Sequence, residues 1–240
     1  MRTAHGDAWQ VEGRLRERFG GGALELRAIR LMASGLPHPQ WNNGDVTGPD
    51  ADLDGARAFY AERGAPWGVR VPAELDWPHG TWLFRKRLMG VHAADFRRAD
   101  AVEGLEIRAA RPGDLEDLVR ISAPAFEEDP DVEGSWIAPH LGADGSTLAL
   151  ATLDGVPVGT GRAVFSDGWA GPCVYVGGVA VVESVRGRGI GAAITSWLSA
   201  QGLARGAEIA HLHPDNDAGA RLFARLGYVE TPGFDVYVDL

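Results

Sequence analysis

The segment with the clearest chemical signature is a glycine-rich stretch that follows an apolar run, Val179-Ala180-Val181-Val182-Glu183-Ser184-Val185-Arg186-Gly187-Arg188-Gly189-Ile190-Gly191-Ala192-Ala193. Glycines let the backbone approach a ligand closely and turn its N–H groups toward it. A helix beginning here would add about half a positive charge at its N-terminus, and Arg186 and Arg188 supply further positive charge. We therefore predict an anion-binding loop suited to a pyrophosphate, rather than a strand-to-helix turn without a ligand.

Two common phosphate-binding motifs fit this loop poorly. A Walker loop requires Gly-x-x-x-x-Gly-Lys-Ser/Thr, and the chain contains no such string. Residues 187–192 match the dinucleotide fingerprint G-x-G-x-x-A, and Glu208 follows at about the expected distance. However, Glu208 begins its predicted strand, whereas the ribose-binding acid belongs at the carboxyl end of one. Only 53 residues follow Gly187, too few to complete a doubly wound sheet.

A dense alternation of strands and helices is predicted from residue 105 onward, and it would position the loop. The predicted strands are 105–109, 148–153, 156–165, 175–182, 208–213 and 234–240, and the predicted helices are 111–126, 189–201 and 218–226. Asp154-Gly155 is a typical hairpin turn. The acidic stretch 127–133 is predicted to be a loop.

The first hundred residues are also predicted to fold. They contain five of the eight tryptophans, too much aromatic mass for a disordered tail. Helices are predicted over 8–19 and 51–63, strands over 23–31 and 67–71, and a loop over 34–50. A polar stretch without periodicity, 92–104, predicts a boundary between domains 1–104 and 105–240.

The pattern Arg186-x-x-Gly189-x-Gly191 after an apolar strand resembles the cofactor loop of the GNAT superfamily of acyl-CoA N-acyltransferases. The order of elements in 105–240 is similar too, and the stretch from Asn216 to Tyr228 resembles the family's closing motif N-x-x-A-x-x-x-Y-x-x-x-G-F. The resemblance implies an α+β fold with a mixed, mostly antiparallel sheet flanked by helices. It also implies a tandem arrangement, in which 1–104 is a degenerate, vestigial half packed against 105–240 and lacking a cofactor loop.

The resemblance implies acetyl-CoA as co-substrate, with its pantetheine arm in a wedge where strands 175–182 and 208–213 part. The implied cofactor-binding residues are Val179, Ala180, Val181, Arg186, Gly187, Arg188, Gly189, Ile190, Gly191, Ala192, Asn216 and Phe223. Phe223 stands where many members carry the tyrosine that protonates the departing thiolate. Because phenylalanine has no hydroxyl, that route is closed here.

Candidates for the general base come from the strand that the resemblance singles out and from the loop after it. Tyr175 and Gly177 alternate with Val179 and are expected on the same face. Tyr175 could relay a proton through water, although a reference pKa of ~10 makes it a poor base and a wall residue is an equal interpretation. Glu183 is a second candidate, with a solvated or loop-bracing role as the alternative.

Histidine and cysteine are two further side-chain types that could do chemistry. His211 and His213 are predicted on one face of their strand, and imidazole has a pKa suited to base work. A structural role is the alternative, and no third ligand lies near them for a metal, so no metal site is predicted. Cys173, the one cysteine, is predicted to be buried packing.

Charge and composition limit the partners. The net charge of −10 falls entirely in 105–240, which argues against nucleic acid. Glu127, Glu128 and Asp131 are candidates to recognise a cationic substrate, with a solvated face as the alternative. All basic residues but Lys86 are arginine, which we attribute to genome composition. No apolar run approaches the roughly 18–20 residues that a membrane-spanning helix needs. The N-terminal stretch lacks a signal-peptide core, so a cytoplasmic protein without a membrane partner is expected.

The resulting hypothesis is an acetyl-CoA-dependent N-acetyltransferase. It would transfer the acetyl group to a primary amine of a small molecule or peptide by direct attack in a ternary complex. The alternative is an acyl-CoA-binding sensor or interaction module without catalysis, which the phenylalanine at 223 and the undetermined base favour. Whether the chain forms a homodimer stays open.

Overall fold

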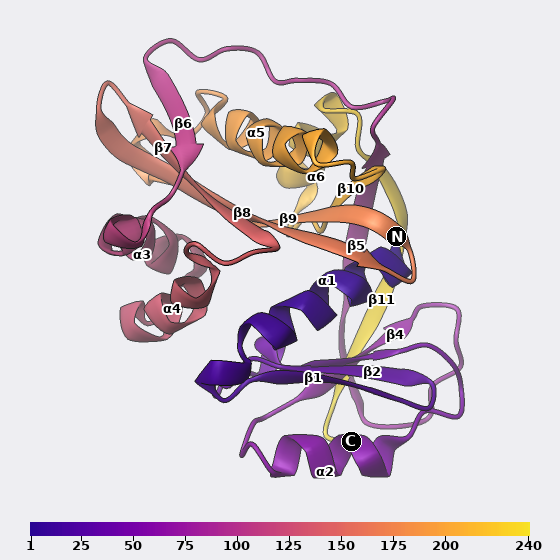
Figure 1. The fold of residues 1–240 in the computed structure, drawn as a ribbon. Coiled ribbons are helices and arrows are strands. Elements are labelled where there is room, and N and C mark those ends of the chain that lie inside the picture. The colour runs from indigo at the N-terminus through magenta and orange to yellow at the C-terminus, as the bar shows by residue number, and fades with distance from the viewer.

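The strands of the computed structural model, which describes residues 1–240, form one continuous sheet in the order β1-β2-β3-β4-β11-β5-β10-β9-β8-β7-β6 (Figure 1). The strands are β1 (Gly22–Leu26), β2 (Ile29–Ala33), β3 (Asn43–Val46), β4 (Gly68–Pro72), β5 (Thr81–His92), β6 (Leu105–Ala109), β7 (Ser146–Leu153), β8 (Val156–Gly168), β9 (Gly171–Val181), β10 (Ile209–Leu212) and β11 (Val229–Val238). Only β3–β4 and β9–β10 pair in parallel. The predicted mixed, mostly antiparallel sheet is confirmed.

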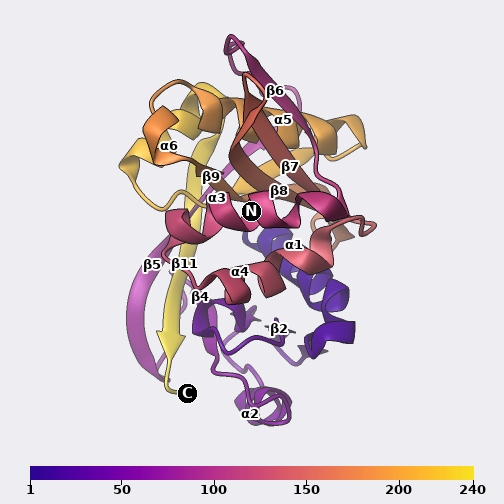
Figure 2. The same ribbon diagram turned by 90° about the vertical axis from the view of Figure 1, so that its left-hand side faces the viewer.

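Helices lie on both sides of this sheet. They are α1 (Arg2–Leu15), α2 (Leu53–Ala61), α3 (Leu115–Phe126), α4 (Pro130–Ile137), α5 (Ile190–Ala204) and α6 (Asp217–Arg225). Figures 1 and 2 place α5 and α6 on one side of β7, β8 and β9, and α1, α3 and α4 on the other. Apolar clusters follow this division, one beneath α5 and another among α1, α3 and α4. No helix combines the length and the apolar character needed to cross a membrane.

Strands from the first hundred residues and from the C-terminal part of the chain alternate at the centre of the sheet. β5, from the first hundred residues, lies between β10 and β11, with Met89 opposite Leu212 and Gly90 opposite Val229. β11, the last strand, lies between β5 and β4. Neither 1–104 nor 105–240 therefore keeps all its strands together, because β11 separates β5 from β1–β4 and β5 separates β11 from β6–β10. The division into these two domains, and the origin of the first as a vestigial copy, stay proposals.

Several local predictions were wrong, each for a physical reason. Residues 23–31 form a hairpin rather than one strand, because the chain reverses where Ala28 has a φ of 53°. The predicted loop 34–50 contains β3, which pairs on both sides. The predicted acidic loop leads into α4, since the Asp129 side chain accepts hydrogen bonds from the first helical N–H groups and Pro130 begins the helix. β5 was not predicted at all.

We predict that fragment 1–104 does not fold by itself. Its β5 would lose both neighbouring strands, exposing Leu88, Met89 and Val91, which are buried in the whole chain. An unpaired, apolar strand promotes aggregation. Circular dichroism and thermal melting of the fragment, with the full chain as control, should show no cooperative transition. Cooperative melting of a monomeric fragment would contradict this expectation.

Candidate active site

A gap opens in the sheet where β9 and β10 part. The two strands pair only from Cys173, opposite Ile209, to Tyr175, opposite His211. β9 then continues to Val181, whereas β10 ends and the chain turns toward α6. The backbone of β9 is consequently without a strand partner on this side, as the family resemblance implied.

A β-bulge in β9 lies at the same level. Thr160 pairs with Ala180 and Arg162 with Gly177, so β9 has one residue more than β8 between these pairs. The left-handed φ of Gly178, 59°, accommodates the irregularity. A bulge of this kind re-aims the side chains that follow it.

The bulge changes the face of the sheet on which odd- and even-numbered side chains of β9 lie. Before it, Val176 packs beneath α5 and Tyr175 packs against α1. After it, Val179 and Val181 pack beneath α5, while Ala180 joins the cluster of α3 and α4. The expectation that Tyr175 shares a face with Val179 is therefore wrong, because simple alternation does not count the extra residue.

The glycine-rich loop has the backbone of an anion site. Gly187 and Gly189 have φ of 79° and 85°, and Gly189 caps the N-terminus of α5. None of the N–H groups of residues 187–192 donates to a protein acceptor. Arg186 Nε donates to the Val181 carbonyl at 2.9 Å, which ties the loop to the end of β9. Free N–H groups at a helix N-terminus favour an anion.

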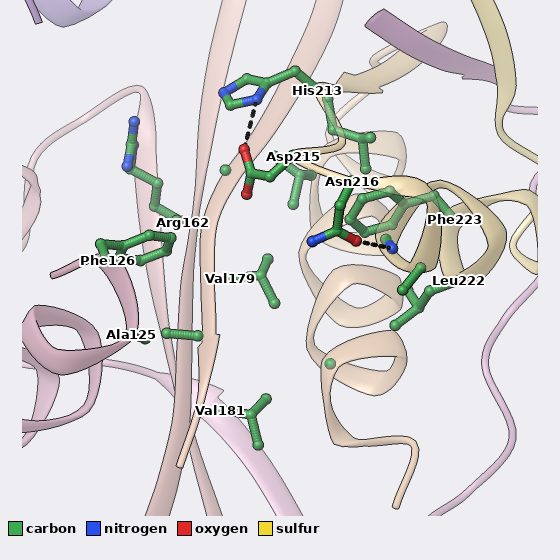
Figure 3. A pocket seen from close by; sticks show the side chains of 18 of the residues that line it. Ala125, Phe126, Arg162, Val179, Val181, His213, Asp215, Asn216, Leu222 and Phe223 are labelled. Atoms are coloured by element: carbon green, nitrogen blue, oxygen red, sulfur yellow. Dashed lines mark hydrogen bonds and ion pairs between the residues drawn. The ribbon is translucent and has the colours of Figure 1, made fainter. Parts of the chain in front are cut away.

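One cavity of about 900 Å³ runs from this loop through the gap to the other side of the sheet. Figure 3 shows Val179 and Val181 on one side of the gap and Asn216, Leu222 and Phe223 on the other. Ten of the predicted cofactor residues line the cavity, and Arg188 and Ala192 do not. Residues before 105 contribute Trp9, His38, Gln40, Trp41 and Lys86. Both ends of the sequence therefore build this cavity.

Asn216 and Phe223 are held on α6. Asn216 is the N-cap, and its Oδ1 accepts a hydrogen bond from the Gly219 N–H at 2.9 Å. Its amide nitrogen is thereby turned toward the gap (Figure 3). Phe223 lies one helix turn beyond Gly219 and lines the same wall.

The part of the cavity on the α1 side, which we call the chamber, has aromatic walls. Trp41 stacks on Trp136 with ring centroids 4.4 Å apart, and His38 stacks on Trp41 at 4.1 Å. His38 Nε2 lies 2.8 Å from Glu128 Oε1. Flat aromatic faces bury large area with little loss of side-chain entropy.

The acidic stretch contributes less to the chamber than predicted. Glu128 lines it, whereas Glu127 and Asp131 are exposed outside it. Glu133, not predicted, is buried in the wall, and burial raises the pKa of its carboxyl. The α4 helix decides this distribution, because it turns neighbouring acidic side chains in different directions.

A buried charge network fixes one side of the chamber. Glu12 lies 2.8 Å from His140 Nε2 and 3.1 Å from Arg162 Nε. Burial alone would raise the pKa of Glu12, but His140 and Arg162 outweigh it and lower that pKa well below its usual range. The carboxylate thus holds the Arg162 guanidinium in the cavity wall (Figure 3).

Two titratable side chains face the gap from the α1 side. Burial raises the pKa of Tyr175 to about 12, so its hydroxyl is protonated at neutral pH. Its ring lies over Gly177, where an added Cβ would be 2.7 Å from the hydroxyl oxygen. Burial, and then the charge of Lys86, lower the pKa of His213 to about 4, so the imidazole is neutral.

His213 is also oriented. Its Nδ1 lies 3.5 Å from Asp215 Oδ1, and its second ring nitrogen points away from Asp215, toward the side where Arg162 lies (Figure 3). The prediction that His211 and His213 share one face is confirmed, since both rings lie near His5 and Tyr175. Asp215 was missed.

The remaining candidates lie outside the cavity. Glu183 is exposed beyond the end of β9, and His211 is buried behind the chamber. Cys173 is buried and free. No group of three or more histidine, cysteine, aspartate or glutamate side chains is arranged to hold a metal ion.

Comparison with known proteins places this site in a class. Residues 114–228 match the family model described as the acetyltransferase (GNAT) family. This segment contains the gap, the loop, His213, Asn216 and Phe223. The chain therefore carries a GNAT acetyltransferase domain, and the protein is an acyltransferase.

Relatives and solved structures extend the likeness to the whole chain. The mycothiol acetyltransferase of a Nocardioides species is 28% identical over 91% of this chain and 74% of its own length. A GCN5-related N-acetyltransferase from Kribbella flavida has the same fold, with a TM-score of 0.71, 21% identity, and coverage of 98% of this chain and 93% of its own. A GCN5-related N-acetyltransferase from Sphaerobacter thermophilus has a TM-score of 0.55 and 16% identity, with coverage of 98% of this chain and 92% of its own.

We predict that Gly189→Glu abolishes binding of CoA. The added carboxylate would lie among the free N–H groups of the loop and repel a pyrophosphate, at about 1–4 kcal/mol for each charge pair. Calorimetry with CoA measures the loss. Gly206→Glu is the matched control, because Gly206 also has a positive φ, of 97°, but lies in open space away from the cavity. Unchanged affinity in folded Gly189→Glu would refute the site.

Proposed function

We propose that the protein transfers an acetyl group from acetyl-CoA to a primary amine of a small molecule or peptide, by direct attack in a ternary complex. One observation carries the proposal: a single cavity joins the anion-binding loop to the aromatic chamber through the gap between β9 and β10. Two substrates that enter from opposite sides of the sheet would meet in that gap. The reaction then needs no covalent intermediate on the protein.

Acetyl-CoA occupies the α5 side of the cavity in this proposal. Its pyrophosphate lies on the N–H groups of residues 187–192, with Arg186 at the rim. The pantetheine arm follows the unpaired edge of β9 from Val181 toward Val179, and the Asn216 amide faces it from α6. The thioester carbonyl comes to the bulge at Gly178, where the strand has backbone groups outside the ladder.

The amine lies in the chamber, and its nitrogen attacks the thioester carbon. His213, neutral and held by Asp215, accepts the proton that the nitrogen loses, directly or through one water. The carbon–sulfur bond then breaks, and the thiolate leaves. Tyr175 is protonated and faces the gap, so it or water returns a proton to the sulfur. Glu183 takes no part, because it is exposed outside the cavity.

A thiol-release assay with acetyl-CoA and a panel of primary amines tests this function. We expect release of free CoA with at least one amine, and a drop in turnover of 10²- to 10⁴-fold in His213→Gln. His92→Gln, an exposed histidine, is the control and should be unaffected. Tight binding of acetyl-CoA without thiol release for any amine would favour the non-catalytic sensor instead.

A second prediction concerns the missing tyrosine. Phe223→Tyr places a hydroxyl on the cofactor wall and should raise turnover while leaving the affinity for acetyl-CoA nearly unchanged. Steady-state kinetics and calorimetry measure the two quantities, and Phe223→Leu controls for altered packing. A fall in turnover with intact affinity would mean that a hydroxyl at this position does not help to protonate the sulfur and that Phe223 serves packing.

A further inference from the structure

Lys86, the only lysine of the chain, lies in the chamber. It is on β5, beyond the residues of that strand that pair with β10, and it lines the cavity. Its Nζ lies 5.9 Å from the centre of the Trp9 ring, so the side chain points toward α1. This is the side of the sheet that carries Tyr175 and His213.

Lys86 is half-buried and has no carboxylate partner, unlike several arginines of the protein. Arg30 is 2.8 Å from Asp7, Arg70 is 2.7 Å from Asp45, and Arg162 is bonded to Glu12, but no ion pair or hydrogen bond involves the lysine amine. Removing even part of the water around a charge without a partner is costly, and a lysine then loses its proton more readily. The structure favours a free amine at this position.

The surroundings of the amine determine its protonation. The titratable groups that act on it or face it come from several elements. They are Arg70 on β4, Asp45 on β3, His213 and Asp215 just after β10, Arg162 on β8 and His5 on α1. Burial, and then Arg70, lower the pKa of Lys86 to about 7. Near neutral pH a large fraction is therefore an unprotonated amine, the form that attacks acyl groups.

We propose that Lys86 is a self-acetylation site, modified by the acetyl-CoA bound in the same cavity when no amine substrate occupies the chamber. The inference rests on the proposed function. β10 ends before the level of Lys86, so no strand separates this side chain from the open edge of β9. Nζ attacks the thioester carbon, and the carbon–sulfur bond breaks. The nitrogen loses a proton, the sulfur gains one, and the products are N-acetyl-lysine and free CoA.

Acetylation would change the chamber in two ways. It replaces an amine that takes up a proton near neutral pH with an amide that cannot, and it adds an acetyl group where the substrate amine must bind. The modified enzyme should therefore use amines more slowly, and a bound amine should protect it.

The test incubates the purified full-length protein with acetyl-CoA and no amine, followed by intact-mass measurement and peptide mapping. We expect one acetyl group on Lys86, none in Lys86→Arg, and a rate that rises with pH through about 7 before levelling. The matched control is the double variant Lys86→Arg, Arg85→Lys. It moves the lysine by one residue to the exposed face of β5, where no acetylation is expected.

Calorimetry on the same sample separates the possible failures. Bound cofactor without acetyl-Lys86, acetylation of the α-amino group instead, or equal acetylation of the moved lysine would each overturn the inference alone. Absence of cofactor binding would overturn the proposed function and this inference together. Thermal melting of both variants establishes that they are folded.

Discussion

The backbone hydrogen bonds between β9 and β10 stop at Tyr175 and His211, and every part of the candidate site depends on that interruption. A continued ladder would close the sheet and separate the loop from the chamber. The interruption leaves peptide groups of β9 without strand partners, and buried peptide groups without partners cost about 1–3 kcal/mol each. An extended ligand with its own amide groups can satisfy them, so the gap is both an opening and a binding surface.

The alternation of strands keeps the gap from spreading through the sheet. β10 has only four residues, and it pairs with β9 over its first three positions. Along its other edge β10 pairs with β5, and β5 in turn pairs with β11. Because β5 comes from the first hundred residues, those residues support the gap directly. They also supply Trp9, Trp41 and Lys86 to the chamber, which a domain of 105–240 alone would lack.

Charge is distributed differently inside the chamber than on the chain as a whole. The net charge of −10 falls in 105–240, yet Arg162 and Lys86 face the chamber together with Glu128 and Glu133. Glu12 pairs with Arg162 at its base. Breaking a buried pair of this kind leaves an uncompensated charge, so the network specifies one arrangement of the wall. Stacked tryptophans complete a rigid enclosure.

The sequence by itself determined the parts whose causes are local. The loop follows from glycines at 187 and 189 with a left-handed φ, the Asp154-Gly155 hairpin from its turn residues, and the cap of α6 from Asn216. Tertiary structure decided what depends on distant partners. The position of β5, and so of Lys86, is set by strands more than a hundred residues away in the sequence. The bulge opposite Gly161 puts Tyr175 and Val179 on opposite faces of β9, although alternation predicts one shared face. Spacing along a strand records alternation, but not an extra residue or a distant neighbour, and those two determine what faces the gap.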